Sequence, residues 1–370
     1  MQKRVIMLMS GGVDSSVSAA LLKEQSYDVI GVYILGWTGT AEFPCTWQQE
    51  EADARAVADK LQIPFHTLNL SKEYETAVID QFFAGYQAGV TPNPDILCNQ
   101  EIKFKAVWQA VRQFEPNYIA TGHYAKIVDG KIFKPADNNK DQTYFLWGIN
   151  REILPHILFP LGNLTKPEVR QLAKKFQLAT ATKKDSQGIC FVGPLKVRQF
   201  LASRVKTRPG DVFLADGRLI AHHDGVLLYT IGQRLAAGSV DWTGDVPPLF
   251  VIAKDIPNNR LIVGSDSATN ATSWSANQLN WLVPNPLEVV KKAKVLYRQE
   301  DIPVAVREVN GAVSVVAEAP VRAVTPGQSV VFYSEDNQLL GGGVIDEVST
   351  IQKTIHDVEK ILSQTKTTAP

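Results

Sequence analysis

The sequence predicts an α/β fold that begins with a doubly wound parallel sheet and continues into a small β-rich domain and a C-terminal β-barrel. Up to about residue 204, short apolar runs typical of buried parallel strands alternate with helical stripes. From about residue 205 the helical stripes disappear, and short alternating runs are separated by Gly, Pro and Asn turns. A chain of 370 residues also exceeds one ordinary hydrophobic core. We therefore expect three domains, at residues 1–204, 205–280 and 281–370.

The elements of the first domain follow from these periodicities. Strands are expected at residues 5–9, 28–34, 64–70 and 118–124, where apolar and β-branched residues gather. Helices are expected at 16–23, 50–61, 74–86, 102–114 and, after a Thr165 to Glu168 capping box, through 176. Residues 91–99 hold two prolines in four positions and are expected to form a stiff loop.

The remaining chain is expected to be mostly strand. In the central domain the runs at 225–231, 249–253 and 261–263 alternate as strands do. After the linker at 284–286, the runs at 294–297, 304–309, 312–318, 329–333 and 342–345 predict a barrel or sandwich, which we assign as a barrel. The C-terminal end reads as a helix.

Composition limits the function classes. Lysine plus arginine and aspartate plus glutamate both number 38, so a nucleic-acid partner needs a local basic face rather than a global excess. No apolar run is long enough for a secretory leader or a membrane span, so we expect a cytoplasmic protein without a membrane partner. We also expect a monomer. Three cysteines, Cys45, Cys98 and Cys190, without close pairs argue against a disulfide scaffold and a metal site.

The chain is organised around a glycine loop between the first strand and the first helix. The loop reads Ser10-Gly11-Gly12-Val13-Asp14-Ser15, and its glycines let the backbone approach a ligand closely. The amides at the start of the following helix favour a phosphate there. The loop resembles the pyrophosphate loop of the N-type ATP pyrophosphatases, which adenylate a carbonyl or carboxylate oxygen. The plainer alternative is a tight turn with a serine N-cap.

Further motifs extend the resemblance from residue 1 to about 348. They include NPDILCN at 93–99, TGHY at 121–124, KDQTYFL at 140–146, KDSQGICF at 184–191, YTIGQR at 229–234, YRQ at 297–299, PGQ at 326–328 and LGGG at 340–343. Together they are similar to the tRNA-specific 2-thiouridylase family, a transferase family that is expected to thiolate the wobble uridine of tRNA. That resemblance implies adenylation of the base 2-oxygen by ATP with Mg²⁺, and sulfur transfer from a cysteine persulfide.

The resemblance also implies roles for individual residues. Cys190 would carry the persulfide and Cys98 would be the nucleophile, ending in a Cys98 to Cys190 disulfide, with Asp95 as acid/base or orienting group. A sulfur donor protein, a cysteine desulfurase or a relay protein, would load Cys190. ATP would be contacted by Leu8, Met9, Ser10, Gly11, Gly12, Val13, Asp14, Ser15, Ile34 and Gly122, with Asp14 as the side chain that could hold the magnesium. The flipped base would meet Asn93, Pro94 and Asp95, and other tRNA contacts would come from Lys140, Asp141, Gln142, Leu296, Tyr297 and the basic run at 291–294.

Some positions depart from the family pattern or have a plain structural explanation. Relatives commonly have an arginine where this chain has Leu296, and a Lys-Gly-Leu-Gly type of loop where it has residues 235–239. Cys45 and His123 are interpreted as structural, because neither has a ligand-type companion in the sequence. Two other functions stay open: a different adenylating ligase or amidotransferase with a small-molecule substrate, and a non-catalytic RNA-binding protein.

Overall fold

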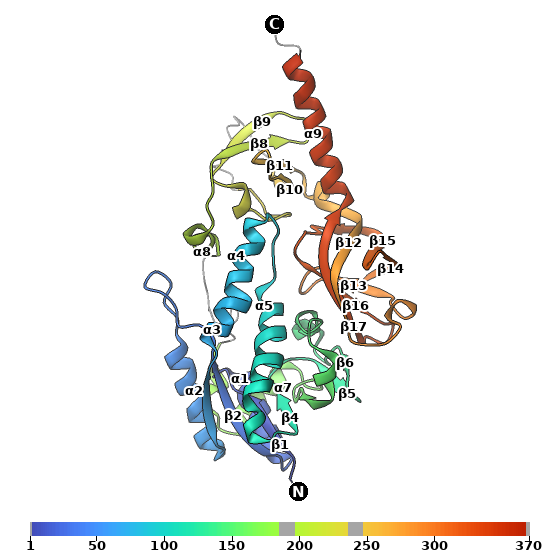
Figure 1. The fold of residues 1–370 in the computed structure, drawn as a ribbon. Coiled ribbons are helices and arrows are strands. Elements are labelled where there is room, and N and C mark those ends of the chain that lie inside the picture. Colours follow the sequence, from blue (N-terminus) through green and yellow to red (C-terminus); the bar gives the residue numbers. More distant parts are fainter. Residues whose placement is uncertain (1, 185–196, 236–246, 368–370) are drawn as a thin grey trace.

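The computed structural model describes residues 2–184, 197–235 and 247–367. These residues form a parallel sheet near the N-terminus, a four-stranded sheet, a closed barrel and a small hairpin. Figure 1 shows the parallel sheet at the bottom, the four-stranded sheet at the top and the barrel at the right. The α/β class with a C-terminal barrel that the sequence predicts is confirmed.

The N-terminal sheet has five strands in the order β3-β2-β1-β4-β7, and every pair is parallel. The strands are β1 (Arg4–Leu8), β2 (Asp28–Leu35), β3 (Phe65–Asn69), β4 (Tyr118–Ala120) and β7 (Ile157–Leu158). The strand order reverses between β1 and β4, and in open α/β sheets ligands bind beyond the carboxyl ends of strands at such a point. The loop after β1 is the glycine loop.

Helices cover both faces of this sheet because its strands alternate between two apolar cores. Met7 and Tyr33 point to the face covered by α1 (Val13–Glu24), α2 (Trp47–Leu61) and α7 (Lys166–Lys175). Ile6 and Val32 point to the other face. That face is covered by two helical stretches, α3 (Ser71–Tyr74), η1 (Glu75–Ile79) and α4 (Asp80–Gln87), then α5 (Pro94–Leu97), η2 (Cys98–Ala106), α6 (Val107–Ala110) and η3 (Val111–Phe114).

The second helical stretch begins earlier than the sequence predicts. We expected a loop at 91–99, but the helix starts at Pro94, and Cys98 is already inside it. The Asn93 side chain accepts a hydrogen bond from the Asp95 amide over 3.2 Å, and Pro94 occupies the first helical position. Proline is well suited to that position because its missing N–H has no intrahelical partner to lose. The two prolines therefore mark a helix start rather than a long loop.

Short elements connect β4 to the rest of the molecule. They are β5 (Lys126–Val128), β6 (Lys131–Phe133), η4 (Asn138–Lys140), η5 (Thr143–Phe145), η6 (Arg151–His156), η7 (Ala179–Thr182) and α8 (Val197–Arg204).

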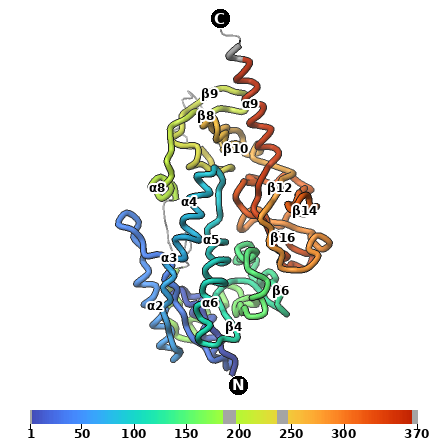
Figure 2. The backbone as a smooth tube through the Cα atoms, viewed as in Figure 1, coloured from blue at the N-terminus to red at the C-terminus, as the bar shows by residue number. Residues whose placement is uncertain are grey.

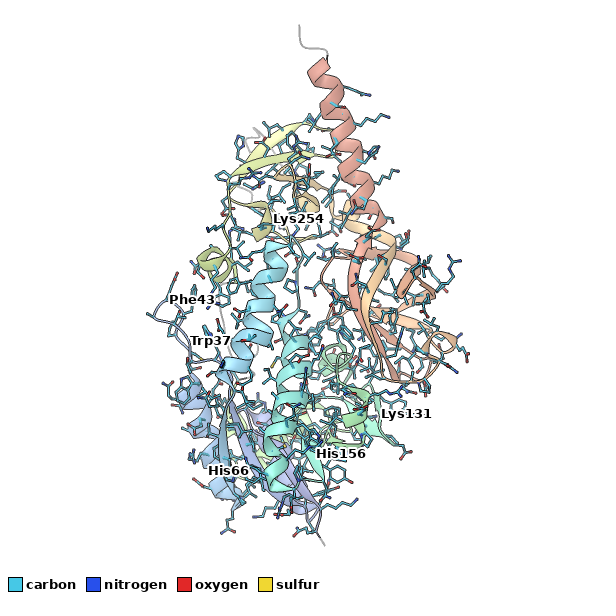
Figure 3. All side chains as sticks on the ribbon, viewed as in Figure 1. Trp37, Phe43, His66, Lys131, His156 and Lys254 are labelled. Atoms are coloured by element: carbon cyan, nitrogen blue, oxygen red, sulfur yellow. The ribbon has the colours of Figure 1, made fainter. Side chains whose placement is uncertain are left out.

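The central sheet contains β8 (Gly210–Leu214), β9 (Leu219–His223), β10 (Phe250–Asp255) and β11 (Arg260–Gly264), in the order β10-β11-β8-β9. The strand expected at 225–231 is wrong: Val226–Leu228 form a turn of 3₁₀-helix. The Leu228 amide donates to the Gly225 carbonyl over 3.0 Å, closing that turn. Lys254 of β10 lies above the end of α4 (Figure 3), and its Nζ donates to the Tyr229 carbonyl over 3.0 Å.

The barrel is closed by six strands in the order β12-β15-β14-β13-β16-β17. They are β12 (Asn270–Trp281), β13 (Lys292–Lys294), β14 (Ile302–Val309), β15 (Ala312–Arg322), β16 (Ser329–Tyr333) and β17 (Leu339–Val348), with η10 (Asp266–Thr269) before them, η11 (Pro286–Glu288) between β12 and β13, and α9 (Ser349–Thr367) after them. The expected boundary at 280/281 falls within β12. Figure 2 shows the barrel beside α5, with α9 leading away to the C-terminus.

Candidate functional site at the carboxyl edge of the parallel sheet

The glycine loop turns sharply from β1 into α1. Gly11 has a φ of +69°, and a Cβ atom there would lie 2.3 Å from the Glu50 carbonyl oxygen, so only glycine fits. Ser15 Oγ accepts from the Ser10 amide over 3.2 Å and donates to the Gly12 carbonyl over 3.1 Å. The loop is therefore shaped by its own side chains, while the first amides of α1 have no intrahelical acceptor.

Gly122 lies where β4 ends and contacts the start of α1. A Cβ atom on Gly122 would lie 2.8 Å from the Ser15 amide nitrogen. This close approach brings the ends of β1 and β4 together at the reversal of strand order. Leu8, Met9, Val13 and Ile34 are buried in the two cores, and their expected contacts with ATP stay predictions.

Asp14 is held by two side chains that the sequence reasoning did not select. Lys166 Nζ lies 2.7 and 2.8 Å from the two carboxylate oxygens, and the Tyr124 hydroxyl donates to Oδ1 over 3.0 Å. Lys166 opens α7, and Glu168 closes its capping box by accepting from the Thr165 amide and hydroxyl, each over 2.7 Å. Only the capping box was visible in the sequence, and it placed the helix start without indicating what the lysine contacts.

Asp95 and Cys98 lie about one helical turn apart at the start of the second helical stretch. Cys98 is fully buried, whereas Asp95 is partly exposed. Asn93 and Pro94 form the cap just before them. Cys190 lies outside the described residues, so the structure places only one of the two expected thiols.

Thr91, three residues before the first residue of this helix, is hydrogen-bonded by both other domains. Its amide donates to the Pro326 carbonyl over 3.0 Å, and its carbonyl accepts from Gln328 Nε2 over 3.0 Å. Its hydroxyl lies 3.2 Å from the Thr230 hydroxyl. Gly327 packs so closely that a Cβ atom would lie 2.7 Å from the Thr91 amide nitrogen. The barrel and the central domain therefore fix the start of the helix that carries Asp95 and Cys98.

The residues expected to contact tRNA occupy very different environments. Lys140 is partly exposed, but Asp141 is buried and accepts from Lys294 Nζ over 3.0 Å. Gln142 bonds to the backbone of Tyr124 in both directions. These tRNA contacts stay predictions, and the structure gives Asp141 and Gln142 intramolecular partners.

Leu296 and Tyr297 are partly buried and lie just after barrel strand β13. Leu296 packs against the barrel core. The ring centroid of Tyr297 lies 4.6 Å from that of Phe145, and the Arg298 guanidinium lies 5.3 Å from the Tyr297 centroid. Within the run at 291–294, Lys291 is exposed whereas Lys294 is buried, so the run does not form a uniform basic surface.

Cys45 and His123 have environments that fit their interpretation as structural residues. Burial raises the pKa of the half-buried Cys45 thiol. Burial, and then the nearby Lys103 charge, lower the pKa of His123 well below its usual value, which keeps the ring neutral. Its Nδ1 lies 2.7 Å from the Thr121 hydroxyl. Among the residues that the structure describes, no three His, Cys, Asp or Glu side chains are grouped to hold a metal ion.

A cleft of about 950 Å³ lies between the second helical stretch and the barrel. Its described lining includes Gln100, Phe104, Trp108, Trp147 and Gln278, but neither Asp95 nor Cys98. The helical residues in the lining recur every three or four positions along that stretch. This cleft thus reaches Asn93, a candidate base contact, but is lined neither by the glycine loop nor by Asp95 or Cys98. In the described chain, no helix combines the length and apolarity needed to cross a membrane.

Comparison with known proteins finds relatives that match this chain over nearly its whole length. Three family models match in sequence order: a tRNA methyl transferase HUP domain at residues 3–194, a tRNA methyl transferase PRC-barrel domain at 198–265 and an aminomethyltransferase beta-barrel domain at 271–345. The tRNA-specific 2-thiouridylase MnmA of Streptococcus mutans is 46% identical over 362 residues, covering 95% of this chain and 97% of the relative. The enzyme of the same name from Lactococcus lactis is 45% identical, covering 96% and 97%.

One solved structure matches about half of the chain. The U34-tRNA thiolase NcsA from Methanococcus maripaludis is 17% identical with a TM-score of 0.34, covering 55% of this chain and 65% of that one. The domain models are named for methyl and aminomethyl transfer, whereas the full-length relatives are named for thiolation. The full-length match is decisive because it spans all three domains at high identity. The chain belongs to the tRNA-specific 2-thiouridylase family.

Proposed function

We propose that this protein uses ATP to activate the 2-oxygen of the wobble uridine in tRNA and replaces that oxygen with sulfur from a cysteine persulfide. Family membership makes the chain a tRNA-uridine sulfurtransferase. The observation that carries the ATP step is the glycine loop at the reversal of strand order, with Lys166 and Asp14 beside it. A small-molecule ligase could share that loop, but nothing in the structure specifically favours one.

The residues of the loop fit a nucleoside triphosphate. The first amides of α1 have no side-chain cap and suit an anion, and the Ser10 and Ser15 hydroxyls lie 3.2 Å apart in the same turn. Gly11 and Gly122 keep the backbone free of side chains at close approach. Asp14 offers carboxylate oxygens of the kind that Mg²⁺ prefers, and Mg²⁺ would neutralise phosphate charge there.

Adenylation needs positive charge near the leaving pyrophosphate. In that step the uridine 2-oxygen bonds to the α-phosphorus, and the bond from this phosphorus to the β-phosphate oxygen breaks. Lys166 supplies a fixed ammonium at the loop, where negative charge develops on the leaving group. Tyr124 and Lys166 also hold Asp14 in one orientation before substrates arrive.

Sulfur transfer then needs two thiols. Cys190 carries the outer sulfur of the persulfide to the activated carbon, and AMP leaves with the former base oxygen. The Cys98 thiolate attacks the inner sulfur, which is the sulfur of Cys190 itself, and breaks the S–S bond. If this attack comes before transfer, the outer sulfur leaves as hydrosulfide, which then reacts with the activated carbon. If it comes after transfer, the outer sulfur is already bonded to the base and is released as the thiocarbonyl. Either order ends in a Cys98 to Cys190 disulfide, which a dithiol reductant must reduce. Asp95 orients the base or moves its proton, and Cys98 must become accessible because it is fully buried here.

The partners follow from this chemistry. They are tRNA and a protein that loads sulfur onto Cys190, either a cysteine desulfurase or a relay protein. We place the enzyme in the cytoplasm as a monomer.

The experiment that tests the function combines two readouts on the full chain. Pyrophosphate release from ATP is measured with and without unmodified tRNA, and the tRNA nucleosides are then analysed by mass for 2-thiouridine. We expect release that depends on tRNA, and thiouridine only when a sulfur source is added. Asp14→Ala should abolish both while the protein stays folded. Release that ignores tRNA would indicate a small-molecule ligase, and absence of release would indicate a binding protein.

A further inference from the structure

A buried group of charges joins the barrel to the segment that follows β6. Lys294 of β13 and Asp141 have side chains only 10% and 4% exposed, and Lys294 Nζ lies 3.0 Å from Asp141 Oδ2. Asp301 lies beside them, 3.8 Å from Lys294 Nζ, and also pairs with Lys134. A lysine buried this deeply cannot serve as an exposed phosphate contact, so its role lies inside the protein.

Asp141 is fully supplied with donors. Its Oδ1 accepts from the Thr143 amide over 3.0 Å and from the Thr143 hydroxyl over 2.6 Å. The Tyr333 hydroxyl, from β16 of the barrel, lies 3.0 Å from the same Thr143 hydroxyl. Charges that are taken out of water require partners of this kind, and their geometry is then narrowly fixed. The barrel thus fixes the backbone around residue 141.

The neighbouring residue continues this connection into the ATP site. The Gln142 amide donates to the Tyr124 carbonyl over 3.1 Å, and the Tyr124 amide donates to Gln142 Oε1 over 2.9 Å. The Tyr124 hydroxyl then donates to Asp14. A continuous path therefore runs from a barrel lysine to the carboxylate of the glycine loop. Its hydrogen bonds are joined by two covalent steps, one from residue 141 to 142 and one through the Tyr124 side chain.

We propose that Asp141 and Lys294 are positioning residues for adenylation: through Gln142 and Tyr124, the barrel sets the orientation of Asp14. This inference rests on the proposed function for its biological meaning, and it assigns both residues a role other than direct tRNA contact. A shift of the barrel against the N-terminal domain would move Tyr124 relative to Asp14. Small misplacements at a reacting centre are costly, since about 1 Å can change a rate by about 100-fold.

The test uses three full-length variants: Lys294→Met, Lys294→Arg, and the double variant Asp141→Asn with Lys294→Met. Affinity for ATP is measured by calorimetry, the KM for ATP by tRNA-dependent pyrophosphate release, and folding by thermal unfolding. We expect Lys294→Met to raise the Kd and KM for ATP by about tenfold. Lys294→Arg should stay near wild type because it keeps the ion pair. The double variant should regain stability, since no buried charge is left unpaired, yet keep the raised values for ATP.

The double variant separates positioning from mere stabilisation. If it binds and uses ATP as the wild type does, the pair only stabilises the fold and the proposal is wrong. Should Lys294→Met alone fail to fold, the double variant and Lys294→Arg still decide the question. Failure of the proposed function would appear differently, as wild-type protein that binds ATP but makes no thiouridine.

The dependence of tRNA affinity on salt tests the competing role as an RNA contact. Each lost phosphate contact lowers the slope of log affinity against log salt by about one. Lys294→Met should leave that slope unchanged, whereas Lys291→Met, at an exposed position of the same run, is the comparison expected to lower it. A lower slope for Lys294→Met would overturn the proposal.

Discussion

Replacing Lys166 with methionine tests the electrostatics of the glycine loop most directly. Methionine keeps most of the length and apolar contact of the side chain but removes the ammonium that lies 2.7 Å from Asp14 Oδ1. Two unit charges about 4 Å apart attract by about 4 kcal/mol at an effective dielectric constant of about 20. The Asp14 side chain is 31% exposed, so solvent screening reduces this value, and charged hydrogen bonds typically contribute about 1.5–3 kcal/mol.

A loss of about 2–3 kcal/mol from the transition state corresponds to a fall in kcat/KM of about 30- to 150-fold. The assay is tRNA-dependent pyrophosphate release at saturating tRNA with varied ATP. Lys175→Met is the matched control, because Lys175 lies on the same helix with a side chain 66% exposed and should leave the rate unchanged. A Lys166→Met enzyme within twofold of wild type would refute a role for this ammonium in adenylation.

Three other predictions concern the loop, the central domain and the thiols. Gly11→Ala should abolish ATP binding, because the added Cβ would lie 2.3 Å from a backbone oxygen. The control is Gly311→Ala, which is also at positive φ but in open space and should lower only the stability of the fold. Calorimetry with ATP and thermal unfolding distinguish the two effects. Burial lowers the pKa of Lys254 to about 8, whereas a lysine in the unfolded chain has a pKa of about 10.4. Between these two pH values the unfolded chain binds more protons than the folded protein. The free energy of unfolding should therefore rise as the pH rises from about 8 to 10.4. Lys254→Met should then stabilise the protein at pH 7 by up to about 3 kcal/mol and remove this rise, as measured by denaturant unfolding at pH 7 and 10; an unchanged pH profile would contradict the argument. Cys190→Ser should adenylate tRNA without accepting sulfur, and Cys98→Ser should accept sulfur without delivering it. A full single-turnover yield of thiouridine from Cys98→Ser would exclude the two-thiol mechanism.

Local sequence patterns were enough to predict the α/β sheet and a C-terminal set of strands, for which they left barrel and sandwich open. Strands such as the one expected at 312–318 agree with the structure because alternating burial leaves a period of two in the sequence. The helix start at Pro94 was missed because proline was interpreted as a loop residue, although Asn93 before it is a good cap. The run at 225–231 alternates like a strand, yet its backbone closes a 3₁₀ turn after Gly225.

The site was predicted less completely, because its contacts connect residues far apart in the chain. The glycine loop has a local signature, but the pairing of Lys166 with Asp14 spans 152 positions and leaves none. Motif resemblance selected Asp141 and Gln142 but could not show that one is buried against the barrel and the other holds Tyr124. Resemblance therefore finds important positions, while only the packing shows which partners they have.

The contacts of Thr91 have a consequence for dissecting this enzyme. A fragment ending near residue 204 would keep the whole parallel sheet and the glycine loop, but without Lys294 it should bind ATP more weakly than the full chain. It would also lose Pro326, Gln328 and Thr230, so the Thr91 amide and carbonyl would face water instead of fixed partners. The helix carrying Asp95 and Cys98 would then have a frayed start. Cutting the chain between its domains should therefore weaken nucleotide binding and abolish sulfur delivery, and the enzyme cannot be reduced to its nucleotide-binding part.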